Sequence, residues 1–390
     1  MQLPNVFQQL EHPYAWIDLN ALDRNVNVMI AGTAPKQIRI ATKSIRSLDV
    51  LQYIQTRIPT HRFAGYMTFT AAETVYLCEA GLDHFLLGYP TLESHSTKQL
   101  MQWIQKGKDI TFMVDCEAHI TFLAQLAEDV GVAAPLCIDI NVSEMYPGLY
   151  FGTRRSSLQT AKQLKMFLQI IMSNPFVYVT SLMGYDAQLA GVGDEAPQKM
   201  KRTAIQTLQQ RTRKYVQKQR TKAINIIEKQ LGPLRFVNGG GTGSMAYSTT
   251  CEEVTEITIG SGLYKPALFD HYRDMPFEAA AGYTVRATRK PAKHTIVAHG
   301  GGYIASGAIG NDKAPHFIDD ALSFYKTEGA GEVQTPIQMP KNRYDIGDGI
   351  VLRHAKAGEL CERFNVLHSY RDKEYVGPMK TYRGDGQCFL

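Results

Sequence analysis

Short apolar runs and longer amphipathic stretches alternate along the chain from about residue 37 onward. The runs are rich in β-branched and aromatic residues, and such alternation predicts parallel strands joined by helical crossovers. The pattern therefore predicts eight strands: QIRIATK (37–43), RFAGYM (62–67), HFLLGYP (84–90), ITFMVD (110–115), PLCIDINV (135–142), VYVTSLMGY (177–185), LRFVNGG (234–240) and TEITIG (255–260).

The segments between these runs have helical periodicity, and Thr70 is the expected N-cap of one of them. Eight β/α units in roughly 230 residues match the size of a (β/α)8 TIM barrel. A doubly wound sheet is the alternative, but it needs a glycine fingerprint after its first strand, where this chain has Lys43. The clearest helical segments are SLDVLQYIQTRI (47–58), TAAETVYLCEAG (70–81), CEAHITFLAQLAEDVG (116–131) and SSLQTAKQLKMFLQIIMS (156–173).

Beyond residue 266 the alternation stops. Segments such as GYTVRATRK and HTIVAHGGGYIASG predict strands joined by glycine turns, without helical periods. The stretch YAWIDL (14–19) predicts a further strand that joins this second, mainly β domain. We therefore expect a barrel domain over 25–265 and a discontinuous β domain made of 1–24 and 266–390.

The composition is that of an ordinary globular protein: of 390 residues, 44% are hydrophobic and 20% charged, which argues against a disordered or fibrous chain. The N-terminal segment does not have the pattern of a signal peptide, and no apolar run nears the roughly 20 residues that span a bilayer. We therefore expect a cytoplasmic protein without a membrane partner. The six cysteines show no CxxC spacing, so neither a zinc finger nor a disulfide framework is indicated.

Much of the basic excess lies in one stretch, residues 199–222. Apolar positions recur there at helical spacing, without interleaved aromatic residues. This pattern favours a solvated helix face over a nucleic-acid surface.

Two loops rich in glycine and hydroxyl groups follow predicted strands seven and eight: GGGTGS (239–244) and GSGLY (260–264). The active site of a TIM barrel lies at the carboxyl ends of the strands, and phosphate is commonly held by these two loops. Glycines let backbone N–H groups converge on an anion, and Thr242, Ser244 and Tyr264 add hydroxyl donors. Either loop alone would indicate only a turn, but together they predict a phosphate cradle.

Lys43 follows predicted strand one, at the expected mouth of the barrel. A surface lysine just past a strand is the simplest interpretation. A desolvated lysine facing a phosphate site is, however, what imine chemistry needs, because burial and nearby positive charge lower the pKa of the amine. The combination favours pyridoxal phosphate, with a phosphosugar Schiff-base aldolase as the alternative.

At these residues the sequence resembles the alanine-racemase-like (fold type III) pyridoxal-phosphate enzymes, within them the group of D-threonine aldolases, D-serine dehydratases and predicted amino acid deaminases or aldolases. The resemblance runs over nearly the whole chain and is specific as an ordered set, although each piece alone is weak. Its motifs are WIDLNALDRNV (16–26), RIATKSIRS (39–47), LMGYDAQLAGVGD (182–194), FVNGGGTGS (236–244), TEITIGSGLYKPALFD (255–270), EGAGEVQTP (328–336) and RHAKAGELCERF (353–364).

The resemblance implies that Lys43 forms the internal aldimine with pyridoxal 5'-phosphate and that Tyr185 lies near the cofactor. One of Arg154 and Arg155, for which we choose Arg155, takes the position of an arginine near the pyridoxal phenolic oxygen. It also implies a homodimer in which the β domain of one subunit closes the barrel mouth of the other. The residues implied to hold the phosphate are Gly241, Thr242, Gly243, Ser244, Gly260, Ser261, Gly262 and Tyr264.

One departure from the resembled group concerns its divalent metal, which binds the substrate's β-hydroxyl through a His-x-Cys or His-x-Asp pair. Counted from the Gly-Asp turn at 347–348, these positions fall on Lys356 and Gly358, and neither residue ligates a metal. His354 and Cys361 are the possible ligands in a shifted register, but a lone histidine in a strand is more often structural. The sequence therefore does not favour a metal and makes Lys356 a candidate catalytic cation.

These observations predict an enzyme that acts on a small, D-configured or β-hydroxy amino acid. Elimination needs an acid at the β-oxygen, retro-aldol cleavage a base there, and racemisation a second base opposite Lys43. The sequence assigns no residue to that last task, which favours a lyase, with an amino acid racemase as the alternative. A non-catalytic pyridoxal-phosphate carrier is disfavoured, because covering a barrel mouth with a second domain is useful mainly for positioning substrate.

Overall fold

A computed structural model describes residues 3–196, 198–307 and 310–390. The chain falls into two compact units. The β unit comprises Met1–Val28, Lys43–Arg57 and Gly260–Cys388, and the barrel unit comprises Met29–Thr42, Ile58–Ile259 and Phe389–Leu390. The domain boundaries expected from the sequence, at 24–25 and 265–266, stay a prediction.

Eight parallel strands close into a barrel in the order β10-β11-β2-β3-β4-β5-β6-β9. Each strand falls within or overlaps one of the eight apolar runs, so the predicted TIM barrel is confirmed and the doubly wound sheet is wrong. The strands are β2 (Gln37–Ala41), β3 (Phe63–Thr68), β4 (Phe85–Leu87), β5 (Ile110–Val114), β6 (Ala134–Asp139), β9 (Val177–Met183), β10 (Phe236–Gly239) and β11 (Glu256–Ile259).

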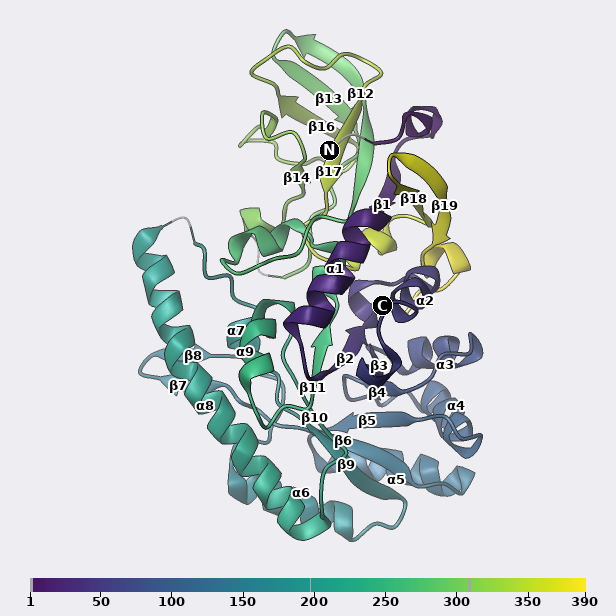
Figure 1. Cartoon of the computed structure of the whole chain (residues 1–390), viewed down its shortest axis with the longest axis vertical. Coiled ribbons are helices and arrows are strands. Elements are labelled where there is room, and N and C mark those ends of the chain that lie inside the picture. The colour runs from purple at the N-terminus through teal and green to yellow at the C-terminus, as the bar shows by residue number, and fades with distance from the viewer. Residues whose placement is uncertain (1–2, 197, 308–309) are drawn as a thin grey trace. The chain divides into compact units, whose positions relative to one another are not determined.

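Helices alternate with the barrel strands along the chain, and those of the barrel unit lie around its strands in Figure 1. Thr70 caps its helix as predicted, since its hydroxyl accepts a hydrogen bond from the Glu73 N–H at 3.1 Å. The helix predicted over 156–173 begins later, because Thr160 and Gln163 form a capping box. The helices are α1 (Leu19–Gly32), α2 (Leu48–Gln55), α3 (Ala71–Glu79), α4 (Ser94–Gln105), α5 (Glu117–Val130), α6 (Ala161–Met172), α7 (Ala187–Ala190), α8 (Lys199–Leu231), α9 (Met245–Thr250) and α10 (Ser261–Tyr264).

The barrel interior is packed with side chains rather than open. Leu86, Met113, Cys137, Met183 and Phe236 come from five neighbouring strands and form one buried cluster. Because side chains alternate along a strand, the residues two positions further on face the interior at the carboxyl ends of the strands. These include four polar side chains: Asp115, Asp139, Tyr185 and Asn238.

The β unit contains a nine-stranded sheet with the main order β15-β16-β13-β12-β1-β18-β19, and β17 pairs with β12 and β14. Strand β1 pairs antiparallel with β12 and parallel with β18, so the N-terminal strand lies inside the sheet of the C-terminal segment. The strands are β1 (Tyr14–Asp18), β12 (Ala281–Ala292), β13 (Thr295–His299), β14 (His316–Phe317), β15 (Ser323–Phe324), β16 (Gln334–Gln338), β17 (Gly349–Arg353), β18 (Val366–Arg371) and β19 (Glu374–Lys380). A small hairpin, β7 (Glu144–Tyr146) and β8 (Leu149–Phe151), belongs to the barrel unit.

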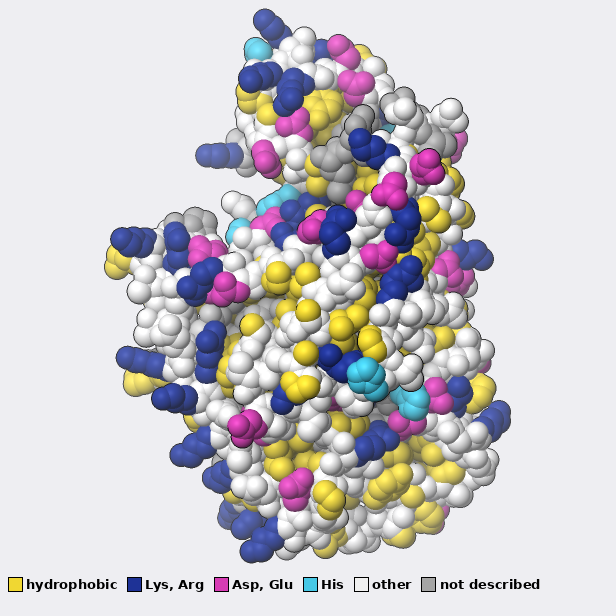
Figure 2. All heavy atoms as spheres, viewed as in Figure 1, with side chains coloured by type: hydrophobic (Ala, Val, Ile, Leu, Met, Phe, Trp, Pro, Cys, Tyr) yellow, Lys and Arg dark blue, Asp and Glu magenta, His cyan; other side chains and the backbone are white. Residues whose placement is uncertain are grey.

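Helix α8 carries the basic stretch that the sequence predicted to be helical. Figure 2 shows its Lys and Arg side chains along one edge of the barrel unit. Arg220 is the exception, because its side chain is fully buried. Within the described residues, no helix combines the length and the apolar character required to cross a membrane.

Candidate active site

Lys43 lies at the carboxyl end of the first barrel strand. It belongs to a short 3-10 turn, Thr42–Ser44, that directly follows β2. Its side chain is exposed in the single chain, and its role as the anchor of a cofactor stays a prediction. The strand delivers the lysine to the predicted end of the barrel, where solvent reaches it.

The loop that carries Lys43 is joined to the loop after β11. The Ser44 and Ser261 hydroxyls lie 3.0 Å apart, and the Tyr264 hydroxyl donates to the Ile45 carbonyl at 3.2 Å. Tyr264 is fully buried, and burial, reinforced by Cys361, raises its pKa well above the usual value. Its hydroxyl therefore holds the loops after β2 and β11 together, and its contact with a phosphate stays a prediction.

The backbone of Lys43 is also held by a turn of the C-terminal segment. Gly358 has φ +82°, and a Cβ at this position would clash with the Lys43 carbonyl oxygen, so only glycine fits the turn without strain. Arg46 donates from Nε to the same carbonyl at 2.9 Å and pairs through Nη1 with Glu362 at 2.6 Å. The segment around Lys356 is thus packed directly against the predicted anchor lysine.

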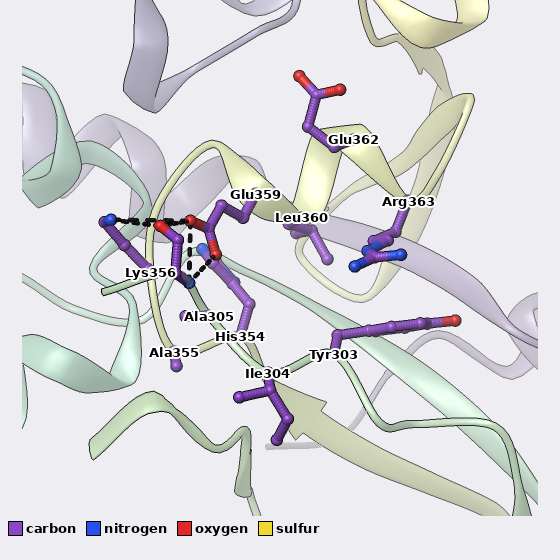
Figure 3. A pocket seen from close by; sticks show the side chains of 11 residues that line it. Tyr303, Ile304, Ala305, His354, Ala355, Lys356, Glu359, Leu360, Glu362 and Arg363 are labelled. Atoms are coloured by element: carbon purple, nitrogen blue, oxygen red, sulfur yellow. Dashed lines mark hydrogen bonds and ion pairs between the residues drawn. The ribbon is translucent and has the colours of Figure 1, made fainter. Parts of the chain in front are cut away.

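A pocket of about 360 Å³ opens in the β unit beside this turn (Figure 3). It is lined by charged and aromatic side chains from two segments that lie far apart in the sequence. The lining residues are Tyr303, Ile304, Ala305, Ser306, His354, Ala355, Lys356, Glu359, Leu360, Glu362 and Arg363. Its size suits a small organic ligand.

Lys356 stands at this pocket in a hydrogen-bonded group. Its Nζ donates to Ser306 Oγ at 2.7 Å and lies 3.7 Å from Glu359 Oε1. Glu359 in turn accepts hydrogen bonds from the Ser306 hydroxyl and from the Ser306 N–H (Figure 3). These contacts hold the Lys356 side chain at the pocket.

His354 and Cys361, the alternative metal ligands, are both buried. Cys361 Sγ donates to the Ile45 carbonyl at 3.2 Å, and burial raises its pKa to about 12. Burial, helped by Arg353, lowers the pKa of His354 to about 3, while the Ala281 backbone opposes the shift. Because metal ligation needs a thiolate, this environment favours a structural role for Cys361, and metal binding here stays an open prediction.

The loop after β10 has the bare backbone expected of a phosphate cradle. Gly240 has φ +78°, and a Cβ there would lie 2.8 Å from Ser248 Oγ. Gly241, Thr242 and Gly243 follow, and the buried Ser244 Oγ has no hydrogen-bond partner among the described residues. A buried hydroxyl without a hydrogen-bond partner destabilises the folded protein. The loop is therefore suited to bind an acceptor-rich group such as phosphate.

The buried side chain of Arg220 binds residues next to this loop. The sequence pattern did not predict this role. Its Nε and Nη2 donate to the Gly184 carbonyl at 3.0 and 2.6 Å, and it lies 3.6 Å from the buried carboxylate of Asp186. Asp186 also accepts from Ser248 Oγ at 3.3 Å. The buried group therefore fixes the turn after β9 relative to the glycine loop after β10.

Tyr185 and Arg155, two predicted cofactor contacts, are brought together. The Arg155 guanidinium lies over the Tyr185 ring, 5.6 Å from its centroid. Burial, helped by Asp186 and opposed by Arg155, raises the pKa of Tyr185 to about 12, so this phenol keeps its proton at neutral pH. The Arg154 guanidinium instead lies over the Tyr150 ring, 4.2 Å from its centroid. The two arginines, which the sequence could not distinguish, therefore contact different tyrosines.

Asp139, at the end of β6, is a second residue that the sequence reasoning missed. Burial and the nearby Asp115 raise its pKa to about 8, and Arg155 opposes this shift. The side chain is therefore mainly protonated at neutral pH. A carboxyl group in this state at the mouth of a barrel can donate a proton or a hydrogen bond.

The raised pKa of Asp139 predicts a pH dependence of stability. Between its ordinary value of 3.8 and about 8, the folded protein holds a proton that the unfolded chain has lost, so the free energy of unfolding falls as pH rises through this range. We expect Asp139→Asn to reduce this fall in urea unfolding at several pH values. The matched control is Asp129→Asn, on the exposed face of α5; equal slopes in both variants would contradict the assignment.

One further group of potential ligands lies beside Asp139, at the start of α5. Among the residues that the structure describes, the ligand atoms of Asp115, Cys116 and His119 lie within 4.8 Å of one another. His119 Nδ1 is 3.1 Å from Asp115 Oδ1 and 3.4 Å from Cys116 Sγ. His119 Nδ1 also accepts from the Asp115 N–H at 3.3 Å, so these contacts join the start of α5 to the residue that follows β5.

Comparison with known proteins was made for the sequence and for the fold. The sequence model of the family described as "Alanine racemase, N-terminal domain" matches residues 17–266. A search of curated proteins by sequence found no significant match.

Among solved structures, the chain is similar to D-threonine aldolase from Filomicrobium marinum, with a TM-score of 0.82 and 16% identity over 99% of this chain and 98% of that one. It is also similar to D-threo-3-hydroxyaspartate dehydratase from Delftia sp. HT23 (TM-score 0.74, 15% identity, 97% and 99% covered). Alanine racemase from Bacillus anthracis matches with a TM-score of 0.63 and 14% identity (96% and 99% covered). At these identities the likeness concerns the fold.

Proposed function

Because the chain belongs to the alanine racemase N-terminal domain family, within the fold type III group of pyridoxal-phosphate enzymes, we propose that it is a pyridoxal-phosphate-dependent lyase. Its substrate is a small, D-configured or β-hydroxy amino acid. The observation that carries the proposal is the contact of the Lys43 backbone with the turn that bears Lys356. This contact supports placing a lysine nucleophile and a cationic side chain at one site.

The residues present fit the cofactor. Ser244, with its unpartnered buried hydroxyl, and the glycine backbone of 241–243 support phosphate binding at the carboxyl end of β10, and Gly260–Gly262 follow the neighbouring strand β11. Tyr185 and Arg155 are the residues proposed to contact the ring. When bound, pyridoxal phosphate supplies an electron sink for the α-carbon of an amino acid.

The chain's own residues then decide the reaction. Lys43 would hold the cofactor through Nζ, and the same amine, when free of the cofactor, would move the proton of the substrate α-carbon. Lys356, held at the pocket by Ser306 and Glu359, donates a proton or hydrogen bond to the substituent on the β-carbon. A proton donor at that place supports elimination more than racemisation. Racemisation remains the second candidate, because Tyr303 lines the same pocket and could face the α-carbon opposite Lys43.

The test is the absorption spectrum of the purified protein. We expect a band near the edge of the visible range that borohydride abolishes. Products from a panel of D- and L-amino acids, assayed as keto acid, aldehyde and opposite enantiomer, then separate elimination, retro-aldol cleavage and racemisation. A protein that stays colourless after incubation with pyridoxal phosphate refutes the proposal.

We also propose that the chain works as a homodimer. The exposed side chain of Lys43 supports this, because a second β unit over the barrel mouth would exclude water from it. Sedimentation or light scattering at micromolar concentration tests the assembly. A monomer with full activity would contradict it.

The glycine loop gives a prediction of its own. Gly243→Val places a side chain where the phosphate approaches bare backbone, so we expect the affinity for pyridoxal phosphate to fall by about tenfold or more. Ala246→Val, at an exposed position of α9, adds comparable bulk nearby and serves as the control. Affinity is measured by absorbance titration; equal affinity in both variants would place the cradle elsewhere.

A further inference from the structure

We propose that the pocket of the β unit is a carboxylate subsite, so that the substrate is an amino acid whose side chain ends in a carboxylate. The inference rests on the proposed function, and it names the substrate class of that site. The charged side chains that line the pocket support it, because some of them are already paired and others are not.

Both acidic side chains of the pocket have partners within the β unit. Glu362 pairs with the buried Arg46 at 2.6 Å. Glu359 accepts from the Ser306 N–H and hydroxyl and lies 3.7 Å from Lys356. Figure 3 shows Glu362 pointing away from Lys356 and Arg363. Neither carboxylate is left to neutralise a further cation.

Arg363 is that further cation. Its guanidinium lies 5.7 Å from the centroid of the Tyr303 ring, and no hydrogen bond or ion pair joins it to any residue that the structure describes. Figure 3 places Arg363 and Lys356 on opposite sides of the pocket. A guanidinium held on an aromatic ring presents its N–H groups as a rigid fork, which matches a carboxylate with two parallel hydrogen bonds.

His354 adds an independent sign that the pocket lacks a ligand group. The residue is 3% exposed, and neither ring nitrogen makes a hydrogen bond of good geometry to a described residue, although the Ala281 backbone lies close enough to raise the His354 pKa. Buried polar atoms are rarely left in that state. The pocket is therefore lined by nitrogen donors from Lys356, Arg363 and His354. These donors favour a ligand rich in hydrogen-bond acceptors.

The size of the pocket limits the ligand. A volume of about 360 Å³ is at the lower end of small-molecule sites. The side chain of an aspartate- or glutamate-like substrate fits this space, with its carboxylate at Arg363 and any β-substituent toward Lys356. The carboxylate at Arg363 could instead be the α-carboxylate of the substrate, and the experiment separates the two.

The first measurement is calorimetric binding of succinate and of its uncharged diamide, succinamide, to the purified protein. We expect succinate to bind at least about tenfold more tightly and Arg363→Met to erase the difference. The control is Arg343→Met, because Arg343 is an exposed arginine of the same unit. This variant should keep the preference for succinate. Arg363 is exposed, so its replacement leaves the fold intact. An unchanged preference in Arg363→Met overturns the inference.

The second measurement uses the holoenzyme with matched acidic and amide amino acids. We expect Arg363→Met to lower kcat/KM for the acidic substrate by about tenfold or more and to leave the amide unaffected. Equal losses for both would assign Arg363 to the α-carboxylate and overturn the side-chain assignment. The cofactor band is unchanged in this variant. If the band is absent from the wild-type protein, the proposed function fails, while succinate binding still decides the pocket.

Discussion

Replacing Lys43 with alanine is expected to remove the cofactor band and to lower turnover by about 10³-fold or more. The side chain at the end of β2 is exposed, so the free energy of unfolding should change little. Lys43→Arg keeps the positive charge without an amine that can bind the cofactor covalently, and it should be equally inactive. The measurements are absorbance, borohydride reduction followed by mass spectrometry, and urea unfolding.

The control for this experiment is Lys106→Ala, an exposed lysine at the end of α4, which should retain both band and activity. A borohydride-reducible adduct that persists in Lys43→Ala would show that another lysine is the anchor. Loss of folding together with the band would show instead that Lys43 is structural.

Replacing Lys356 with alanine is expected to lower turnover by ~10²-fold, the usual contribution of a positioned acid, with cofactor binding nearly unchanged. The ammonium group is fixed at the pocket by the 2.7 Å hydrogen bond to Ser306, and Ser306→Ala should lose part of the same activity by releasing it. Steady-state kinetics and the cofactor band are measured side by side. If Lys356 serves only to pair with Glu359, turnover in Lys356→Ala will stay within a few fold of wild type.

Chelation tests whether the enzyme needs a divalent metal. Since a side-chain cation stands at the pocket, we expect activity to survive extended dialysis against EDTA. Activity that is lost to the chelator and restored by zinc or manganese would contradict this and would direct attention to His354 and Cys361.

The sequence was sufficient to predict the barrel because each strand is a separate apolar run and each crossover has its own helical period. It also placed Lys43 and the two glycine loops at strand ends, since strand order follows chain order in this fold. It could not give the exposure of Lys43 or the contact of Gly358 with the Lys43 carbonyl. Those features depend on segments that lie far apart in the chain.

Arg220 shows what kind of signal was overlooked. It occupies a position on the buried face of α8 that otherwise carries Thr212, Val216, Ala223 and Ile227. A charged residue at an apolar helical position is rarely tolerated without a buried partner. The buried position of Arg220 was not predicted, because the many basic residues of the stretch together indicate one solvated helix face.

The place of β1 in the nine-stranded sheet also bears on how the chain is made. Trp16 pairs with Gly282 on one side and with His368 on the other, so β1 meets its partners only after all the barrel strands have been synthesised. The barrel strands between them are complete by then and need no residue of β1 for their ladder. Co-translational folding therefore proceeds from the barrel outward, while an apolar N-terminal strand waits unpaired. Contacts of such long sequence separation form slowly, and the waiting strand is the part of the nascent chain most in need of chaperone protection.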